Sequence, residues 1–372
     1  MNYKETLFFV SQCLTIQHCP ERIPIIREKI RSGDVDWEQF VWVSSNQMMI
    51  PAVYLQFKRA NLLIELPDDL VAHLEIIYQQ NFDRNKEILQ QVHRIIELLN
   101  KHSIYPIFLK GVGNLLDNLY HDIGERMMGD IDFLVAEKDV LKVAEILLTD
   151  GYKVLEGKNP IFDFAHRHFP RLVSPNAIAG VEIHYRIVKS PFDKKLSFKI
   201  INKEKKKLII PGIAYVLSDS HQIIYNMMVV QINDRLFYRN PIYFRHIYDL
   251  FLLSMRTDPL NTLRNFGFYF QRLNNYLALS SKLLGYPISM SYEENIFAKI
   301  YVSKYMIDIK YVRFTKIRNY FLYIIFRLFN YLIQIIQASY KSSMRQSLYA
   351  RLSDPKWYVA HLRSYNTFFR HS

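Results

Sequence analysis

The hydrophobic periodicity of the chain changes near residue 105, and this change constrains the fold more than any other feature. Up to residue 101, apolar residues recur every three or four positions, as at 70–78 and 88–99, which predicts amphipathic helices. Beyond 105, short apolar runs alternate with turn signals, and we expect about five strands, at 106–109, 131–135, 152–155, 167–173 and 180–188. Helical patterns return at 215–232, 242–255, 260–284 and 293–309.

This succession of segments predicts an α+β fold with a small mixed sheet between helical domains. We expect a helical N-terminal domain, an α+β core, a second helical domain and a basic, aromatic-rich helical tail, at 1–101, 102–212, 213–309 and 310–372. The lysine-rich segment 202–207 is expected to be an exposed loop of the core.

Composition excludes several classes of protein. Half of the 372 residues are hydrophobic, and Gly and Pro number only 11 and 14, so a disordered or collagenous chain is excluded. The two cysteines, Cys13 and Cys19, are too few to staple a chain of this size, and no apolar run follows a basic N-terminus. We therefore expect a cytoplasmic protein with structural cysteines.

Positive charge is concentrated at the C-terminal end. Residues 301–372 contain twelve Lys and Arg against Asp308 and Asp354, which leaves only +3 of the total +13 for the first 300 residues. Such an imbalance is typical of a segment that meets nucleic acid or an anionic membrane, and equally of a solvated helical tail. Aromatic and cationic residues interleave over 311–320, which suits an RNA as well as a membrane interface.

The segment 320–337 is apolar over about the length that spans a bilayer and carries a single charge, Arg327. Arg327, Asn330 and two glutamines would be costly in the middle of a membrane. We therefore favour a helix that packs on the domain or lies at a membrane surface, with the protein peripheral to the inner membrane in the second case.

Two carboxylates are placed on one apolar strand. Side chains alternate along a strand, so Asp130 and Asp132 emerge on the same face. Burial of two like charges in an apolar strand needs a cation, and Mg²⁺ is a hard ion that carboxylates hold well. On the later strand, Glu182 shares a face with His184 and Arg186, and it offers a third carboxylate as ligand or base. An ordinary half-solvated strand would show the same alternation.

Upstream, Lys110 and Gly111 lie where a strand is expected to turn into a helix. Glycine allows the backbone to approach a phosphate closely, and Lys110 adds a positive charge. The segment is not a P-loop, because no Gly-X4-Gly-Lys-Ser/Thr pattern is present. Together with the downstream Asp pair, it predicts a site for a triphosphate beside its metal.

These motifs, in this order, resemble the uncharacterised bacterial nucleotidyltransferase family of the polymerase-β-like superfamily. The resemblance extends from about Asp36 to the helix around His221, and it rests on Leu109-Lys110-Gly111, Tyr120, Arg126, the run 129–135, Gly151-Tyr152 and the run 182–186. It implies transfer of a nucleoside monophosphate from an NTP to an acceptor hydroxyl, with pyrophosphate released and two Mg²⁺ ions held by three carboxylates.

The resemblance also implies roles for individual residues. Asp130, Asp132 and Glu182 would be the metal ligands and catalytic carboxylates. Lys110, Gly111 and Arg126 would face the triphosphate. One departure is Val112, because the superfamily usually has Gly-Ser at this turn and Val112 offers no hydroxyl to a phosphate.

Two functions remain open from the sequence. The first is a Mg²⁺-dependent nucleotidyltransferase whose acceptor could be a tRNA, a polysaccharide, a small molecule or a protein. The second is a non-catalytic protein of the same fold that binds RNA or an anionic membrane through residues 310–372, and Val112 is its best support.

Overall fold

A computed structural model of the chain describes residues 1–155, 167–189, 192–233, 242–340, 342–355 and 358–359. The described residues belong to two compact units. The first unit comprises residues 1–235 and 242–303, and the second begins at Lys304. The predicted domain boundaries near 101 and 212 lie inside the first unit and stay predictions.

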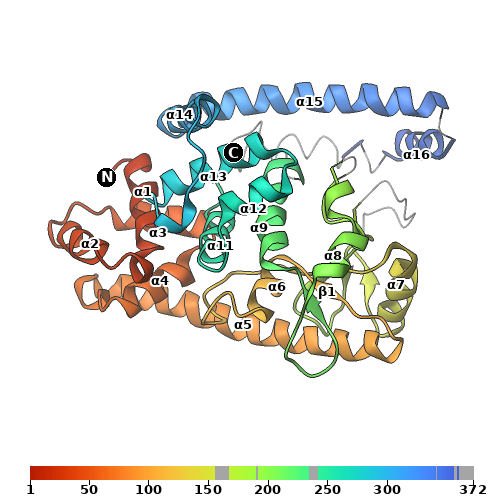
Figure 1. The fold of residues 1–372 in the computed structure, drawn as a ribbon, viewed down its shortest axis with the longest axis horizontal. Coiled ribbons are helices and arrows are strands. Elements are labelled where there is room, and N and C mark those ends of the chain that lie inside the picture. Colours follow the sequence, from red (N-terminus) through yellow and green to blue (C-terminus); the bar gives the residue numbers. More distant parts are fainter. Residues whose placement is uncertain (156–166, 190–191, 234–241, 341, 356–357, 360–372) are drawn as a thin grey trace. The chain divides into compact units, whose positions relative to one another are not determined.

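The first unit begins with a group of helices that ends in one long helix. They are α1 (Tyr3–Cys13), α2 (Arg22–Arg31), α3 (Trp37–Asn46), α4 (Ile50–Arg59) and α5 (Asp68–Lys101). Side chains cap two of these helices, since Asn2 and Asp36 accept hydrogen bonds from the first turns of α1 and α3. Cys13 and Cys19 are buried and form no disulfide. The helix α5 runs from α4 to the sheet (Figure 1).

The sheet contains seven strands among the described residues, in the order β3-β4-β5-β2-β1-β7-β6. The strands are β1 (Ile107–Phe108), β2 (Asp130–Leu134), β3 (Lys153–Val154), β4 (Leu172–Val173), β5 (Gly180–His184), β6 (Lys206–Lys207) and β7 (Tyr215–Val216). The helices between them are α6 (Lys110–Leu116), α7 (Val140–Thr149) and α8 (Phe198–Glu204). The expected α+β class with helical flanks is confirmed.

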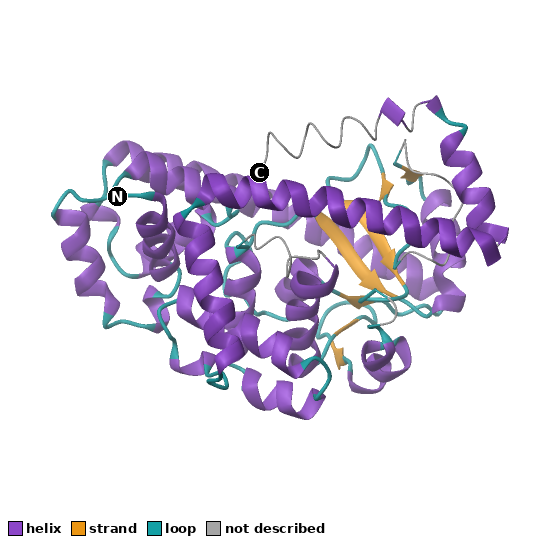
Figure 2. Ribbon diagram, turned by 90° about the horizontal axis from the view of Figure 1, so that it is seen from above, coloured by secondary structure: helices purple, strands orange, loops and turns teal. Residues whose placement is uncertain are grey.

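The two longest strands, β2 and β5, form the centre of the sheet. They pair in parallel, and Asp132 lies opposite Glu182 in this register. Figure 2 shows two long strands side by side in orange. One face of the pair is apolar, because Ile131, Phe133, Val181 and Ile183 are fully buried. This buried face fixes the register, since a slip by one residue would bring the carboxylates into the core.

Amide side chains of α5 hold the backbone that leads into β2. Asn81 donates to the carbonyl of Gly124 at 2.7 Å, and Asn85 donates to the carbonyl of Arg126 at 2.8 Å. Six residues further along α5, Gln91 bonds both the N–H and the carbonyl of Ala179, directly before β5. The amide N–H groups buried on α5 are therefore satisfied by the chain segments that lead to the two central strands.

The first unit continues with a second group of helices, which pack mainly on one another. These are α9 (Asp219–Met228), α11 (Phe244–Ser254), α12 (Pro259–Phe266), α13 (Phe270–Leu283) and the start of α14 (Ile296–Lys310). A bidentate ion pair ties α11 to the segment before β2. Arg126 donates to both carboxylate oxygens of Asp249, at 2.8 and 2.6 Å, and both side chains are buried.

The second unit contains the end of α14 together with α15 (Val312–Tyr340) and α16 (Ser342–Leu352). Asp308 joins α14 to α15, because its carboxylate accepts hydrogen bonds from Arg318 at 2.5 and 3.0 Å. By length and composition, α15 is the one described helix that could cross a membrane, and none of its most apolar window is buried.

Three local expectations were wrong. The segment 202–207 is not a loop, because α8 extends to Glu204 and β6 follows; the ammonium of Lys206 there pairs with Asp117 and Asp219. The sheet has seven strands rather than about five, and the missed strands, β6 and β7, are only two residues long. The expected helix 260–284 is two helices, since Gly267 takes a left-handed conformation (φ +67°) that ends α12.

The Arg126–Asp249 pair predicts a large effect on stability. Replacement Asp249→Ala leaves a buried guanidinium without its carboxylate, and we expect the free energy of unfolding to fall by about 3–5 kcal/mol. Urea denaturation measures this change. The exposed pair Arg264–Glu293 supplies the control, since Glu293→Ala should cost less than about 1 kcal/mol. Equal losses in the two variants would contradict a structural role for the buried pair.

Candidate functional site

The functional residues predicted from the sequence meet at β2 and β5. Strand alternation places Asp130 and Asp132 on the face of β2 that lies away from the buried Ile131 and Phe133. The parallel register then places Glu182 beside Asp132. Two carboxylates from neighbouring strands thus share one face of the sheet.

Two basic side chains contact the carboxylate of Asp132. The ammonium of Lys110 lies 2.5 Å from its Oδ1, and Nε2 of His184 lies 2.8 Å from the same oxygen. The imidazole Nε2 also lies 3.6 Å from Oε2 of Glu182. Because an ionised carboxylate only accepts, His184 carries its proton on Nε2 and donates to Asp132.

These contacts decide the charge state of the site. Burial opposes ionisation of Asp132, but the Lys110 ammonium and the His184 hydrogen bond outweigh it and hold the pKa of Asp132 well below its usual range. Burial likewise opposes the charge on Lys110, yet the negative charge of Asp132 raises the pKa of Lys110. For Glu182, the nearby His184 imidazole and the charge of Lys110 outweigh burial and lower the pKa. The site is therefore ionised at neutral pH.

Asp130 has a different partner. Its carboxylate forms an ion pair with Arg171, which comes from the segment before β4. Gly180 lies opposite Asp130 in the β2–β5 register, and a methyl group at this position would overlap the Arg171 guanidinium. The missing side chain thus opens the path by which Arg171 reaches Asp130. Burial, together with the charges of Asp132 and Glu182, raises the pKa of Asp130 despite Arg171.

A second histidine borders the site. The rings of His168 and His184 lie 5.0 Å apart, and Nε2 of His168 lies 3.9 Å from Oε2 of Glu182. Residue 168 reaches this place through a single antiparallel bridge to residue 184. Burial and the neighbouring histidine lower the pKa of His168, so its imidazole is neutral at pH 7.

The donor set fits a hard divalent cation. Oxygen or nitrogen atoms of Asp132, Glu182 and His184 all lie within 4.8 Å of one another. A histidine that binds a metal usually donates its second N–H to a partner, whereas Nδ1 of His184 is buried without a hydrogen-bond partner among the described residues. Carboxylates are the ligands that Mg²⁺ prefers. The arrangement therefore favours carboxylate ligands, with His184 orienting Asp132.

The turn at 109–111 delivers Lys110 to the site. Leu109 is extended, and Lys110 then takes a left-handed conformation with φ +49°, which is unusual for a residue other than glycine. Gly111 allows close packing, because a methyl group there would lie 2.6 Å from Nη1 of Arg126 and 2.8 Å from Met128. Val112 is buried in the apolar core. The contact of Gly111 with a triphosphate stays a prediction.

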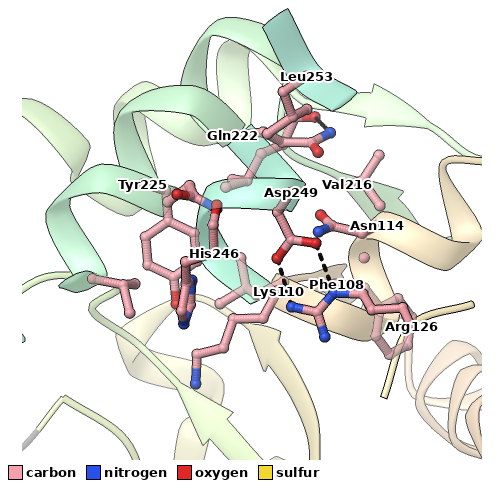
Figure 3. A pocket seen from close by; sticks show the side chains of 15 residues that line it. Phe108, Lys110, Asn114, Arg126, Val216, Gln222, Tyr225, His246, Asp249 and Leu253 are labelled. Carbon is pink, nitrogen blue, oxygen red and sulfur yellow. Dashed lines mark hydrogen bonds and ion pairs between the residues drawn. The ribbon is translucent and has the colours of Figure 1, made fainter. Parts of the chain in front are cut away.

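Arg126 does not join the carboxylates of β2 and β5. Its guanidinium is held by Asp249 beside a small cavity of about 30 Å³, which has room for one or two waters. Figure 3 shows this pair with His246 and Tyr225, and shows the Lys110 amine pointing away from Arg126. The residues that line this cavity include none of the three carboxylates. The expected phosphate contact of Arg126 stays a prediction.

Sequence reasoning misses two basic residues of the site, Arg171 and His168. A basic strand exposed to solvent would contain both residues as well, so the pattern of residues assigns neither of them a role. The available signal is Gly180, which begins β5 and whose missing side chain makes room for Arg171. His166 lies outside the described residues.

Comparison with known protein families gives a match that includes the residues of the candidate site. No curated protein matches the chain. Residues 33–273 match the family described as "uncharacterised nucleotidyltransferase", and this range contains the sheet, the carboxylates and the Arg126–Asp249 pair. The match confirms the resemblance that the motifs indicated. Because it spans well over half of the sequence, the chain belongs to this family of nucleotidyltransferases.

Proposed function

We propose that the chain is a Mg²⁺-dependent nucleotidyltransferase that transfers a nucleoside monophosphate from an NTP to an acceptor hydroxyl and releases pyrophosphate. Family membership supports nucleotidyl transfer as the general reaction. The observation that carries the finer proposal is the pairing of Asp132 with Glu182 across two parallel strands, with donor atoms close enough to share a cation.

Asp130, Asp132 and Glu182 would hold the metal. When bound, Mg²⁺ supplies positive charge at the phosphate oxygens and lowers the pKa of the acceptor hydroxyl. His184 keeps Asp132 ionised and fixes the direction of its carboxylate through the 2.8 Å hydrogen bond. A carboxylate oriented in this way is prepared for the cation before substrate arrives, which is the main contribution of a protein to phosphoryl-type transfer.

Lys110 is the candidate contact for the triphosphate. Its ammonium can exchange the Asp132 carboxylate for a phosphate oxygen, because both partners are anionic and its four-carbon stem is flexible. Arg171 provides a second cation at the same face of the sheet. In the reaction the acceptor oxygen forms a bond to the α-phosphorus, the bond from that phosphorus to the leaving pyrophosphate breaks, and the hydroxyl proton of the acceptor passes to solvent.

The acceptor is proposed only as a molecule with a free hydroxyl group. The tRNA, polysaccharide, small molecule and protein that the sequence left open are all acceptors of this kind. The non-catalytic alternative has lost part of its support, because Val112 is a core residue and its position offers packing rather than a phosphate contact.

Removal of the Asp pair tests the proposal. The double variant Asp130→Asn, Asp132→Asn keeps the size of both side chains but removes the charges that would hold the cation. We expect its transfer of label from α-labelled NTP to lysate components in MgCl₂ to fall by more than about a hundredfold. Glu145→Gln on the exposed face of α7 is the matched control and should transfer label like the wild type. Equal labelling by the double variant and the control would refute the proposal.

Lys110 allows a test that does not depend on the acceptor. Lys110→Met removes the cation that neutralises Asp132, so the unfolding midpoint should be lower than in the wild type without metal. Addition of MgCl₂ should then raise the midpoint of this variant by more than that of the wild type. A ligand that binds only the folded state stabilises it, and in the variant the Lys110 ammonium no longer competes with Mg²⁺ for Asp132. Differential scanning calorimetry measures both shifts.

The control for this measurement is the double variant Lys110→Met, Asp132→Asn. It lacks the charge that is proposed to bind the metal, and its midpoint should not respond to MgCl₂. A response equal to that of Lys110→Met would show that the cation binds elsewhere.

A further inference from the structure

The strongest feature outside the proposed active site is the exposed apolar face of α15. Seven residues spaced three or four positions apart form an apolar stripe along the helix: Phe314, Ile317, Phe321, Ile325, Leu328, Leu332 and Ile335. Each of these side chains is 57–64% exposed. A stripe of this length is costly in water, and it indicates a surface that meets an apolar partner.

The stripe is broad as well as long. At roughly 100° per residue, the arc from Ile317 to Phe329 covers about 120° of the helix circumference. Phe329 and Ile336 lie beside the stripe and are each 60% exposed. Most polar residues of α15 lie on the other side, at Thr315, Asn319, Arg327, Asn330, Gln334 and Gln337. Two polar residues fall within the apolar arc, Ser339 and Arg318, and the guanidinium of Arg318 is paired with Asp308. The helix is therefore amphipathic over most of its length.

The centre of the polar side is suited to a membrane surface rather than to its interior. Arg327 donates to the hydroxyl groups of Tyr323 and Tyr331, which lie one turn before and one turn after it. Tyrosine and arginine together are typical of the interface between lipid headgroups and water. A span would instead place the polar row in hydrocarbon, where each polar group is costly.

The positive charge of the C-terminal segment indicates which kind of membrane surface α15 would meet. Residues 301–372 carry a net charge of +10, and Arg313, Lys316 and Arg327 lie on the polar side of α15. A basic amphipathic helix that lies in the plane of a membrane is attracted to anionic lipid, and each cation near the surface adds about 1 kcal/mol of attraction. We propose that α15 binds an anionic membrane surface and makes the protein peripheral to the membrane.

Two other occupants fit the same face less well. A second copy of α15 would bring two segments of +10 together, and with only Asp308 and Asp354 as acids they could form few interhelical salt bridges. An RNA needs cations and aromatic rings on the exposed face, whereas the stripe consists mostly of aliphatic residues that cannot stack on bases. The lipid surface matches both the apolar stripe and the basic charge.

Sedimentation of the full-length protein with vesicles tests this proposal. We expect the wild type to sediment with vesicles of phosphatidylcholine and phosphatidylserine, and to stay in the supernatant with phosphatidylcholine alone. Binding should weaken as salt rises, because the headgroup attraction is screened. Binding should also be released by washing with high salt or carbonate, as for a helix that does not span the membrane.

Two charge-matched variants separate the stripe from general electrostatics. Phe321→Glu, Leu328→Glu places two acids in the stripe and should abolish sedimentation. Asn330→Glu, Gln337→Glu makes the same charge change on the polar side and should keep most of the binding. Phe321→Ala, Leu328→Ala removes apolar area without adding charge, and it should weaken binding by roughly tenfold or more. Circular dichroism and the unfolding midpoint verify that all three variants fold like the wild type.

Four results would overturn the proposal. The first is that the wild type binds no anionic vesicle, and the second is that the stripe variant binds as well as the polar-side variant. The third is that binding of the wild type resists a carbonate wash, which would indicate a spanning helix. The fourth is loss of a dimer or of RNA co-sedimentation in the stripe variant without any lipid binding, which would assign the stripe to a second copy or to RNA.

Discussion

Two carboxylates that lie side by side on a buried sheet need positive charge within contact distance, and much of the first unit can be understood from this requirement. Asp132 and Glu182 are brought together by the parallel register of β2 and β5. Lys110 and His184 then supply the compensating contacts to Asp132. An ammonium can leave a carboxylate when a different cation arrives, whereas an apolar neighbour could not have stabilised the pair at all.

The surrounding structure holds these groups in place. Asn81, Asn85 and Gln91 on α5 bind the backbone directly before β2 and β5, so one helix sets the entry of both strands. The buried ion pair of Arg126 and Asp249 fixes the segment that leads into β2 to α11 as well. The site is therefore supported from both sides by hydrogen bonds that are shielded from water and rigid.

Whether a feature of the fold or the site could be predicted from the sequence depended on how far apart in the chain the interacting residues lie. The α+β class and the carboxylates Asp130, Asp132 and Glu182 follow from period-two alternation, which is a property of neighbouring residues. Arg171 and His168 could not be assigned, because their approach to Asp130 and Glu182 depends on strand pairing across a loop. The family resemblance implies that Arg126 contacts the triphosphate. In the structure its partner is Asp249, which lies 123 residues later in the sequence.

The sequence by itself determined where the longer helices and strands form, which of their faces are polar, and how strongly basic the C-terminal end is, because these properties arise from composition and local periodicity. Only the tertiary structure decided which charges meet. The ion pairs of Lys110 with Asp132, of Arg171 with Asp130 and of Arg126 with Asp249 join residues that are far apart in the chain. Their formation depends on strand register and helix packing, which no local pattern encodes, and for Arg171 also on the space left by Gly180.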